Sequence, residues 1–231
     1  MVLTFVGSEK READVTTFRF KPEGAVTWQA GQYLYYTLPH DNPDDRGIKR
    51  WFTIAAPPSS GEIRITTRIV EGQQRSTFKE ALHNLKPGDT VEAEAPEGDF
   101  TVDDPARSMI FIAGGIGITP FYSILAEASA NDQKLHVHVL YANRTDEIVF
   151  RDEFAKFQEQ NPGLKIDYIV QPDKLDDAKL QAAVQAEENP LIYISGPEPM
   201  VDAIGDQLVN LGVDEKNIKK DHFPGYQPTL A

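Results

Sequence analysis

The sequence predicts a β half followed by an α/β half, namely an antiparallel six-stranded barrel and then a five-stranded parallel sheet wrapped by helices. In the first half, short β-type runs are separated by clusters of Gly, Pro, Asn and Asp, a pattern typical of small barrels. From residue 109 onward, nearly continuous apolar strands alternate with helical stretches, which indicates a parallel sheet. Asp103, Asp104 and Pro105 break structure between the two patterns, so we place the domains at residues 1–102 and 103–231.

The N-terminal half contains one predicted helix among its strands. We expect this helix over residues 76–85, because Phe78 and Leu82 lie on one helical stripe. Thr77 and Glu80 match a T-x-x-E capping box, and the free N–H groups at the same helix start can also bind a phosphate. The six strands are expected at residues 3–6, 16–20, 33–38, 51–55, 63–70 and 90–95.

The C-terminal half alternates between strands and helices along its length. The first four strands are expected at residues 109–113, 136–141, 166–170 and 191–194. The helices are expected around residues 121–130, 150–160, 179–186 and 199–211. A fifth strand near the end places Asp221 and Phe223 on one face, because residues two apart in a strand point the same way. The alternative for this tail is an edge strand that packs its aromatic ring.

Composition and charge exclude several classes of function. No apolar run approaches the roughly 20 residues that span a bilayer, and residues 1–12 lack the apolar core of a secretory signal. We therefore expect a cytoplasmic protein without membrane association. The net charge of −13 disfavours nucleic acid as a partner. The absence of Cys excludes disulfides, thiolate nucleophiles and cysteine-ligated iron–sulfur clusters in this chain.

Only two of the five histidines lie close together in the sequence. His136 and His138 fall on one face of a predicted strand. A metal pair is one interpretation, but two ordinary strand residues in a sheet are the favoured one, and we expect no metal site.

A glycine-rich turn follows the first parallel strand. Residues 110–114 are apolar up to Gly114, and then Gly115, Gly117, Thr119 and Pro120 follow. We expect Thr119 to cap a helix and Pro120 to occupy its first position. Such a turn brings backbone N–H groups and the positive end of a helix dipole to a diphosphate. The alternative is the tight strand-to-helix turn of any α/β fold.

A second motif lies at the start of a barrel strand, where Arg50, Trp51, Phe52 and Thr53 follow one another. A guanidinium can pair with a diphosphate through two parallel hydrogen bonds. Phe52 points to the same face as Arg50, and the Thr53 hydroxyl can donate toward a ring nitrogen. An ordinary barrel strand with an exposed arginine is an equally good interpretation.

The second parallel strand ends in Asn143 and Arg144. In a dinucleotide fold this strand end meets the adenosine ribose, and an acidic side chain there suits the 2′-hydroxyl of NAD. Arg144 instead suits a 2′-phosphate. Asp146 and Glu147 follow closely, so a surface pair between Arg144 and one of them is the alternative.

The fourth parallel strand runs into a turn that contains Ser195, Gly196 and Pro197, with Met200 after it. Its tip lies on the same carboxyl edge of the sheet as the glycine-rich turn, and ligands bind at this edge. Ser195 is therefore expected as a polar group at the base of a cleft. The alternative is a plain connection between strand and helix.

Together these patches resemble the motifs of the ferredoxin–NADP reductase superfamily, in the same order and over nearly the whole chain. The matching motifs are Arg50-x-Phe52-Thr53, Gly115-x-Gly117-x-x-Pro120, Ser195-Gly196-Pro197-x-x-Met200 and Asp221-x-Phe223. The resemblance implies an FAD-binding β-barrel in residues 1–102 and an NAD(P)-binding α/β domain in residues 103–231.

The resemblance also implies roles for single residues on the FAD side. Arg50, Ser76 and Thr77 would hold the FAD diphosphate. Phe52, with Trp51 beside it, would lie against the isoalloxazine. Thr53 would form a hydrogen bond near the reactive flavin nitrogen.

On the nucleotide side, the resemblance implies two groups of residues. Those that frame the nicotinamide and the flavin are Ser195, Asp221 and Phe223, with either Phe223 or Tyr226 as the ring nearest the flavin. Those that bind the nucleotide are Gly115, Gly117, Thr119, Arg144, Gly196, Pro197 and Met200. Many relatives have Cys in place of Ser195 and Glu in place of Asp221.

The predicted function is therefore that of a flavin-dependent NAD(P)H oxidoreductase. NAD(P)H delivers a hydride to bound FAD, and the electrons pass to a separate carrier such as ferredoxin or flavodoxin. Arg144 predicts a modest preference for NADPH over NADH. One alternative is a flavin reductase in which flavin is a released substrate. Another is a non-catalytic flavoprotein subunit that only relays electrons.

Overall fold

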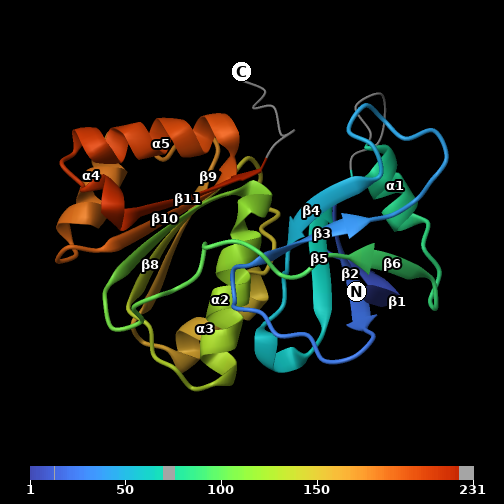
Figure 1. Ribbon diagram of the computed structural model, residues 1–231. Helices are drawn as coiled ribbons and strands as arrows, with labels where there is room; N and C mark the ends of the chain where they lie inside the picture. The colour runs from blue at the N-terminus through green and yellow to red at the C-terminus, as the bar shows by residue number, and fades with distance from the viewer. Residues whose placement is uncertain (13, 70–75, 224–231) are drawn as a thin grey trace. The chain divides into compact units, whose positions relative to one another are not determined.

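The computed structural model describes residues 1–12, 14–69 and 76–223 (Figure 1). The chain divides into two compact units, Met1–Thr101 and Val102–Ala231, which we name the β unit and the α/β unit. Tyr226, predicted near the flavin, lies outside the described residues. Among the residues that the structure describes, no helix has the length and hydropathy of a membrane span.

The β unit is an antiparallel six-stranded sheet in the order β4-β3-β6-β1-β2-β5, which confirms the predicted barrel-like half. Its strands are β1 (Val2–Lys10), β2 (Val15–Pro22), β3 (Tyr33–Thr37), β4 (Lys49–Thr53), β5 (Ile63–Arg68) and β6 (Thr90–Ala93). A short 3-10 helix, η1 (Pro58–Ser60), precedes β5, and α1 (Thr77–His83) precedes β6.

The core of the β unit is built from alternate strand positions and one stripe of α1. Phe18 and Phe20 of β2 are fully buried, as are Phe78 and Leu82 of α1, so the predicted helical stripe is confirmed. The helix begins one residue earlier than the T-x-x-E pattern predicts. Its cap is Ser76, whose side chain accepts a hydrogen bond from the Lys79 N–H at 3.4 Å. The predicted cap at Thr77 is wrong because the Thr77 hydroxyl is engaged elsewhere.

The α/β unit is a five-stranded parallel sheet in the order β11-β10-β7-β8-β9, as predicted. Its strands are β7 (Met109–Gly114), β8 (Val137–Asn143), β9 (Leu164–Val170), β10 (Leu191–Pro197) and β11 (Ile218–Phe223). Its helices are α2 (Thr119–Ala130), α3 (Arg151–Gln160), α4 (Asp177–Gln185) and α5 (Glu198–Asn210). The 3-10 helices η2 (Gly115–Ile118) and η3 (Glu215–Asn217) precede α2 and β11.

Helices cover both faces of this sheet, with α4 and α5 on one side and α2 and α3 on the other (Figure 1). On the first side, Ile110 and Ile112 of β7 belong to a core cluster with residues of α4 and α5. On the second side, the ring of Phe111 stacks on Phe121 of α2 at 4.6 Å between centroids. Every residue of β7 is buried, which explains why the strand is apolar throughout rather than alternating.

Candidate functional site

The guanidinium of Arg50, on β4, lies in a small polar network with its side chain only 14% exposed. Nη1 donates to the carbonyl oxygens of Arg46, Gly47 and Lys49 at 2.6, 2.9 and 2.7 Å. Nη2 donates to Asp44 Oδ1 at 2.5 Å. Nε is buried and has no hydrogen-bond partner among the described residues. The side chain is therefore oriented by its surroundings rather than free in solvent.

The Asp44 carboxylate lies among the donors that the sequence assigns to a phosphate. Its Oδ1 accepts from Arg50, and its Oδ2 accepts from the Thr77 N–H at 3.3 Å and from Arg46 Nη2 at 2.9 Å. Partial burial opposes the charged form, but hydrogen bonds from Arg46 and the charge of Arg50 outweigh it and lower the pKa of Asp44 below its ordinary value. The Asp44 carboxylate therefore occupies the position at which the sequence predicts a phosphate.

The Thr77 side chain links the start of α1 to the loop that contains His40 and Asp44. Its Oγ1 accepts a hydrogen bond from the Asp44 N–H at 2.9 Å and lies 3.0 Å from His40 Nε2. His40 Nδ1 lies 2.8 Å from the Leu38 carbonyl oxygen, which can only accept, so Nδ1 carries the proton and Nε2 accepts from the Thr77 hydroxyl. Sequence reasoning missed both Asp44 and His40. The loop around them reads only as a turn rich in Asp, Asn and Pro.

Along β4, the side chains alternate as predicted. Arg50 and Phe52 share one face, where the Phe78 ring lies 5.6 Å from the Arg50 guanidinium carbon and 5.8 Å from the Phe52 ring centroid. Trp51 points to the opposite face and packs on Tyr33, with centroids 5.2 Å apart. Thr53 ends the strand and is 5% exposed. The structure therefore brings Arg50, Phe52 and Thr77 together around Phe78 and Asp44, and places Trp51 on the other side.

In the α/β unit, the glycine-rich turn differs from its prediction at one point. A 3-10 turn, η2, intervenes between β7 and α2, so the residue that caps α2 is Ile118. Thr119 is already helical, is 2% exposed, and donates its hydroxyl proton to the Ile116 carbonyl oxygen at 3.2 Å. The predicted N-cap role of Thr119 is therefore wrong. Gly115 has a φ of +53°, in the left-handed region that favours glycine.

Gly117 is needed in this turn because the backbone of β10 packs directly against it, and the Met200 side chain of α5 packs against Gly114. A Cβ on Gly117 would lie 2.3 Å from the Ser195 carbonyl oxygen and 2.7 Å from the Gly196 Cα. A Cβ on Gly114 would lie 2.3 Å from the Met200 sulfur. The fold thus brings the glycine turn and the Ser-Gly-Pro-x-x-Met segment together at the carboxyl edge of the sheet.

Ser195 and Asp221 meet across the parallel pair β10–β11, where they are direct register partners. The Ser195 Oγ donates to Asp221 Oδ2 at 3.2 Å, and Ser195 is fully buried. Phe223 pairs in register with Pro197 and is partly exposed. Ser195 therefore lies beneath the surface of this edge, rather than open at the base of a cleft.

Arg144 is exposed just beyond the end of β8 and forms no hydrogen bond or ion pair with the described part of the chain. The alternative that it pairs with Asp146 is wrong, because Asp146 pairs with Arg151 instead. The neighbouring Asn143 has a buried Nδ2 with no partner among the described residues. Arg144 and the Asn143 amide thus offer donors at this strand end.

The two neighbouring histidines engage separate carboxylates. His136 Nε2 lies 3.1 Å from Glu187, and His138 Nε2 lies 2.7 Å from Asp167. Both line a groove of about 510 Å³ between β8, β9 and α4. No group of three or more His, Asp or Glu residues that could hold a metal ion occurs in residues 1–12, 14–69 and 76–223.

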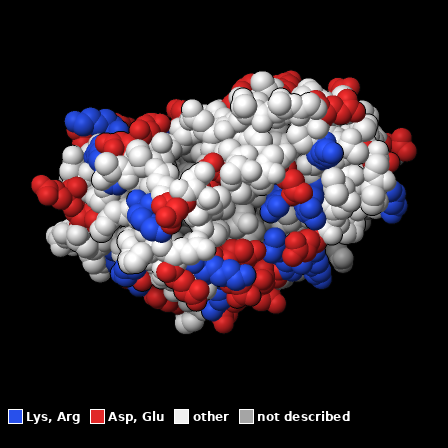
Figure 2. Space-filling model, turned by 90° about the horizontal axis from the view of Figure 1, so that it is seen from below, with Lys and Arg blue, Asp and Glu red and all other residues white. Residues whose placement is uncertain are grey.

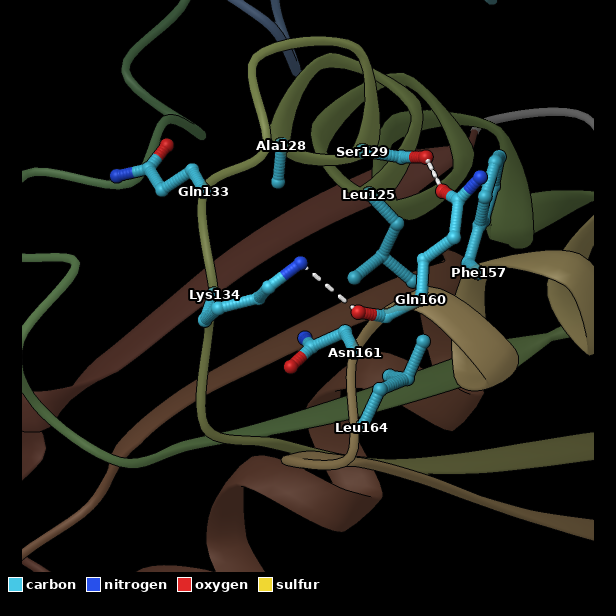
Figure 3. A pocket seen from close by; sticks show the side chains of 9 residues that line it. All are labelled: Leu125, Ala128, Ser129, Gln133, Lys134, Phe157, Gln160, Asn161 and Leu164. Atoms are coloured by element: carbon cyan, nitrogen blue, oxygen red, sulfur yellow. Dashed lines mark hydrogen bonds between the residues drawn. The ribbon is translucent and has the colours of Figure 1, made fainter.

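A second pocket lies where α2 and α3 end (Figure 3). Lys134 Nζ donates to the Gln160 carbonyl oxygen at 2.9 Å, and the Ser129 hydroxyl donates to the Gln160 side chain. Its volume of about 10 Å³ is at the lower limit for one water molecule. This pocket is therefore too small for a cofactor.

Comparison with known proteins identifies both units. Residues 3–102 match the family described as "Oxidoreductase FAD-binding domain", and residues 111–206 match the "Oxidoreductase NAD-binding domain". The chain belongs to the ferredoxin–NADP reductase superfamily. As a member of this superfamily it is an oxidoreductase with FAD and NAD(P) as cofactors.

The relatives include several flavohemoproteins. The chain is 32% identical to the flavohemoprotein of Vibrio cholerae over 235 residues, which cover 95% of this chain and 59% of that protein. It spans 52% to 65% of the length of the curated relatives that it matches here. The "Flavohem-like-FAD/NAD Binding Domain of Nitric Oxide Dioxygenase" from V. cholerae superposes with a TM-score of 0.80 at 26% identity, covering 96% of this chain and 98% of that one.

The ferredoxin–NADP⁺ reductase of Plasmodium falciparum shares the fold, with a TM-score of 0.81 at 18% identity. That likeness covers 96% of this chain and 95% of the other.

The residues present fit the cofactors of a ferredoxin–NADP reductase relative. In the β unit, Arg50 and the Thr77 N–H already hold a carboxylate, so their donors are arranged for a negative group. In the α/β unit, Gly117 lets the backbone of β10 pack against the glycine-rich turn at the carboxyl edge of the sheet, which is the edge where dinucleotides bind in such folds.

Proposed function

We propose that this chain transfers a hydride from NAD(P)H to bound FAD and passes the electrons to a separate carrier such as ferredoxin or flavodoxin. The observation that carries the proposal is the anion-binding arrangement at Arg50 and Thr77, which supplies the donors that a flavin diphosphate needs. In the proposal the carrier lies outside these 231 residues, because they contain no Cys for an iron–sulfur cluster.

In this proposal the β unit holds FAD. The residues that bind its diphosphate are Arg50, Ser76 and Thr77. Phe52, fixed between Phe78 and Tyr36, offers an aromatic face to the flavin. Thr53 would form a hydrogen bond with the flavin ring, and Trp51 would support the strand from its opposite face, where it packs on Tyr33. When bound, FAD accepts the hydride and releases electrons to the carrier.

The α/β unit binds NAD(P)H in the proposal. The residues that shape its site are Gly115, Gly117, Thr119, Gly196, Pro197 and Met200. Both the hydroxyl and the backbone N–H of Thr119 donate to the Ile116 carbonyl oxygen, so Thr119 would hold the turn in shape rather than donate to the nucleotide. Asp221 accepts a hydrogen bond from the Ser195 hydroxyl and so fixes the orientation of that hydroxyl, while Phe223 supplies a ring at the same strand end.

The test is anaerobic titration of the purified protein with NADH and with NADPH while the absorbance of bound flavin is followed. We expect FAD to copurify and to be bleached by at least one of the two. Bound FAD that neither nucleotide reduces would instead support an electron-relay subunit.

A flavin reductase that releases its flavin is a second candidate, and one observation favours it. The Asp44 carboxylate lies where the flavin diphosphate is assigned, which lowers the expected affinity for flavin. Loss of FAD on dialysis, with reduction of added free flavin by NAD(P)H, would establish this second function.

On the face shown in Figure 2, basic side chains lie among acidic ones. With a net charge of −13, long-range forces oppose an acidic carrier, so short-range contacts would have to hold it. The proposed carrier complex is therefore expected to form faster as salt screens the repulsion.

Arg144→Ala is expected to lower kcat/KM for NADPH by about 1.4-fold to fivefold and to leave the value for NADH nearly unchanged. Arg144 is exposed, and an exposed ion pair contributes about 0.2–1 kcal/mol. Steady-state kinetics at low salt measure both values. The control is Lys174→Ala, which removes an exposed positive charge elsewhere in the α/β unit. An equal fall for both nucleotides would show that Arg144 serves the fold or the shared diphosphate.

A further inference from the structure

The Asp44 carboxylate engages the donors at which the proposed function places the flavin diphosphate. It contacts the Arg50 guanidinium, the Thr77 N–H and the Arg46 side chain. The Asp44 side chain is 18% exposed and that of Arg50 is 14% exposed. Because both charges are largely withdrawn from water, their attraction is screened less than that of a surface pair.

The Arg50 guanidinium has one hydrogen-bond donor, Nε, that Asp44 does not engage. The three loop carbonyls take Nη1, so only the edge formed by Nε and Nη2 remains for an anion. Asp44 engages this edge through Nη2, and Nε is left buried without a partner among the described residues. A phosphate group that accepts from both nitrogens would make the bidentate contact that Asp44 does not make.

The backbone of Asp44 is held independently of its side chain. The Asp44 N–H donates to Thr77 Oγ1 at 2.9 Å, and His40 lies 3.0 Å from the same oxygen. A rotation of the Asp44 side chain can therefore vacate the Arg50 edge without releasing the loop from α1. An incoming anion then replaces one carboxylate rather than unfolding the loop.

We propose that Asp44 is an internal competitor for this anion site, so that a flavin phosphate binds by displacing the Asp44 carboxylate and its affinity is set by that exchange. The inference rests on the proposed function, because it takes Arg50 as the diphosphate-binding residue. It makes Asp44 the residue that determines whether flavin is held tightly or exchanged. Asp44 would lower the affinity of any phosphate ester that binds through Arg50.

The test compares the wild type with Asp44→Asn and Asp45→Asn in the full chain after removal of flavin. Asparagine keeps the size of the side chain but removes its charge. Asp45 is the adjacent exposed residue, so Asp45→Asn makes the same change in net charge without touching Arg50. Asp44→Ser serves as a second variant should Asp44→Asn fail to fold, as judged by circular dichroism.

Binding is measured by quenching of flavin fluorescence with FAD and with riboflavin, and by calorimetry with inorganic pyrophosphate. We expect Asp44→Asn to bind FAD about tenfold more tightly than the wild type, the change expected from removing one charged competitor. Asp45→Asn should stay within about twofold. Riboflavin, which has no phosphate, should bind all three proteins equally.

Equal or weaker FAD binding by Asp44→Asn would overturn the proposal and show that Asp44 orients Arg50 instead. A gain for riboflavin of the same size would overturn it too, because the effect would not depend on phosphate. Pyrophosphate separates this inference from the proposed function. Tighter pyrophosphate binding by Asp44→Asn without flavin binding by any variant would retain Asp44 as a competitor and reject FAD as the ligand.

Discussion

Arg50→Ala is expected to weaken FAD binding by about 1.5–3 kcal/mol, or roughly tenfold to 150-fold. The Arg50 guanidinium donates to the Asp44 carboxylate, which lies at the proposed diphosphate site, and its Nε has no hydrogen-bond partner among the described residues. The substitution also removes the 2.5 Å ion-pair partner of Asp44 and leaves that carboxylate paired with Arg46 alone, so its charge is less compensated and repels an incoming anion more strongly.

Equilibrium titration with FAD measures this loss. Arg64→Ala is the matched control, because Arg64 also lies in the β unit and pairs with a carboxylate, that of Glu62 at 2.7 Å. We expect Arg64→Ala to retain the affinity of the wild type. Arg50→Lys should fall between wild type and Arg50→Ala, since it keeps the charge and loses the planar fork. Unchanged FAD affinity in Arg50→Ala would remove Arg50 from the site.

Gly117→Ala is expected to destabilise the α/β unit by about 1–3 kcal/mol, the usual cost of forcing extra volume into a packed region. The added Cβ would meet the Ser195 carbonyl at 2.3 Å, and neither backbone can move without disturbing β10. Since Ser195 carries the hydrogen bond to Asp221, NAD(P)H affinity should fall together with stability, while FAD binding by the β unit persists.

Gly205→Ala provides the control for this second variant. Its Cβ would meet only the far end of the Lys220 side chain, which can move away, and alanine favours the helix α5 that contains Gly205. Urea unfolding of both variants gives the comparison, with no loss of stability expected for Gly205→Ala. Reduced NAD(P)H affinity with unaltered stability in Gly117→Ala would show that the added methyl meets the ligand and not the strand.

The features that the sequence predicted well are those with a repeating pattern. Apolar runs gave four of the five parallel strands, and the two-residue period placed Arg50 and Phe52 on one face, beside Phe78. Helix starts were predicted less well, because they depend on single hydrogen bonds. Thr119 and Thr77 both fit a capping pattern, yet one donates to Ile116 and the other to His40.

Asp44 could not have been predicted, because its role comes from tertiary contacts. It is separated from Thr77 by 33 positions in the chain, and only the loop between β3 and β4 brings them together. Six residues separate it from Arg50, a spacing that has no periodic meaning in a loop. The sequence indicates that a guanidinium and free N–H groups can bind an anion, but it does not show that the chain supplies one.

The register between β10 and β11 has a consequence for how the protein is made. Parallel neighbours need a long crossover, and α5 and η3 lie between these two strands. During synthesis, β10 therefore leaves the ribosome well before Asp221, and the hydrogen bond from the Ser195 hydroxyl to Asp221 cannot form until β11 docks. The NAD(P)H side of the enzyme matures only after residues 218–223 have emerged, whereas the β unit, encoded first, is complete much earlier. Flavin capture by the nascent chain can thus precede competence for hydride transfer.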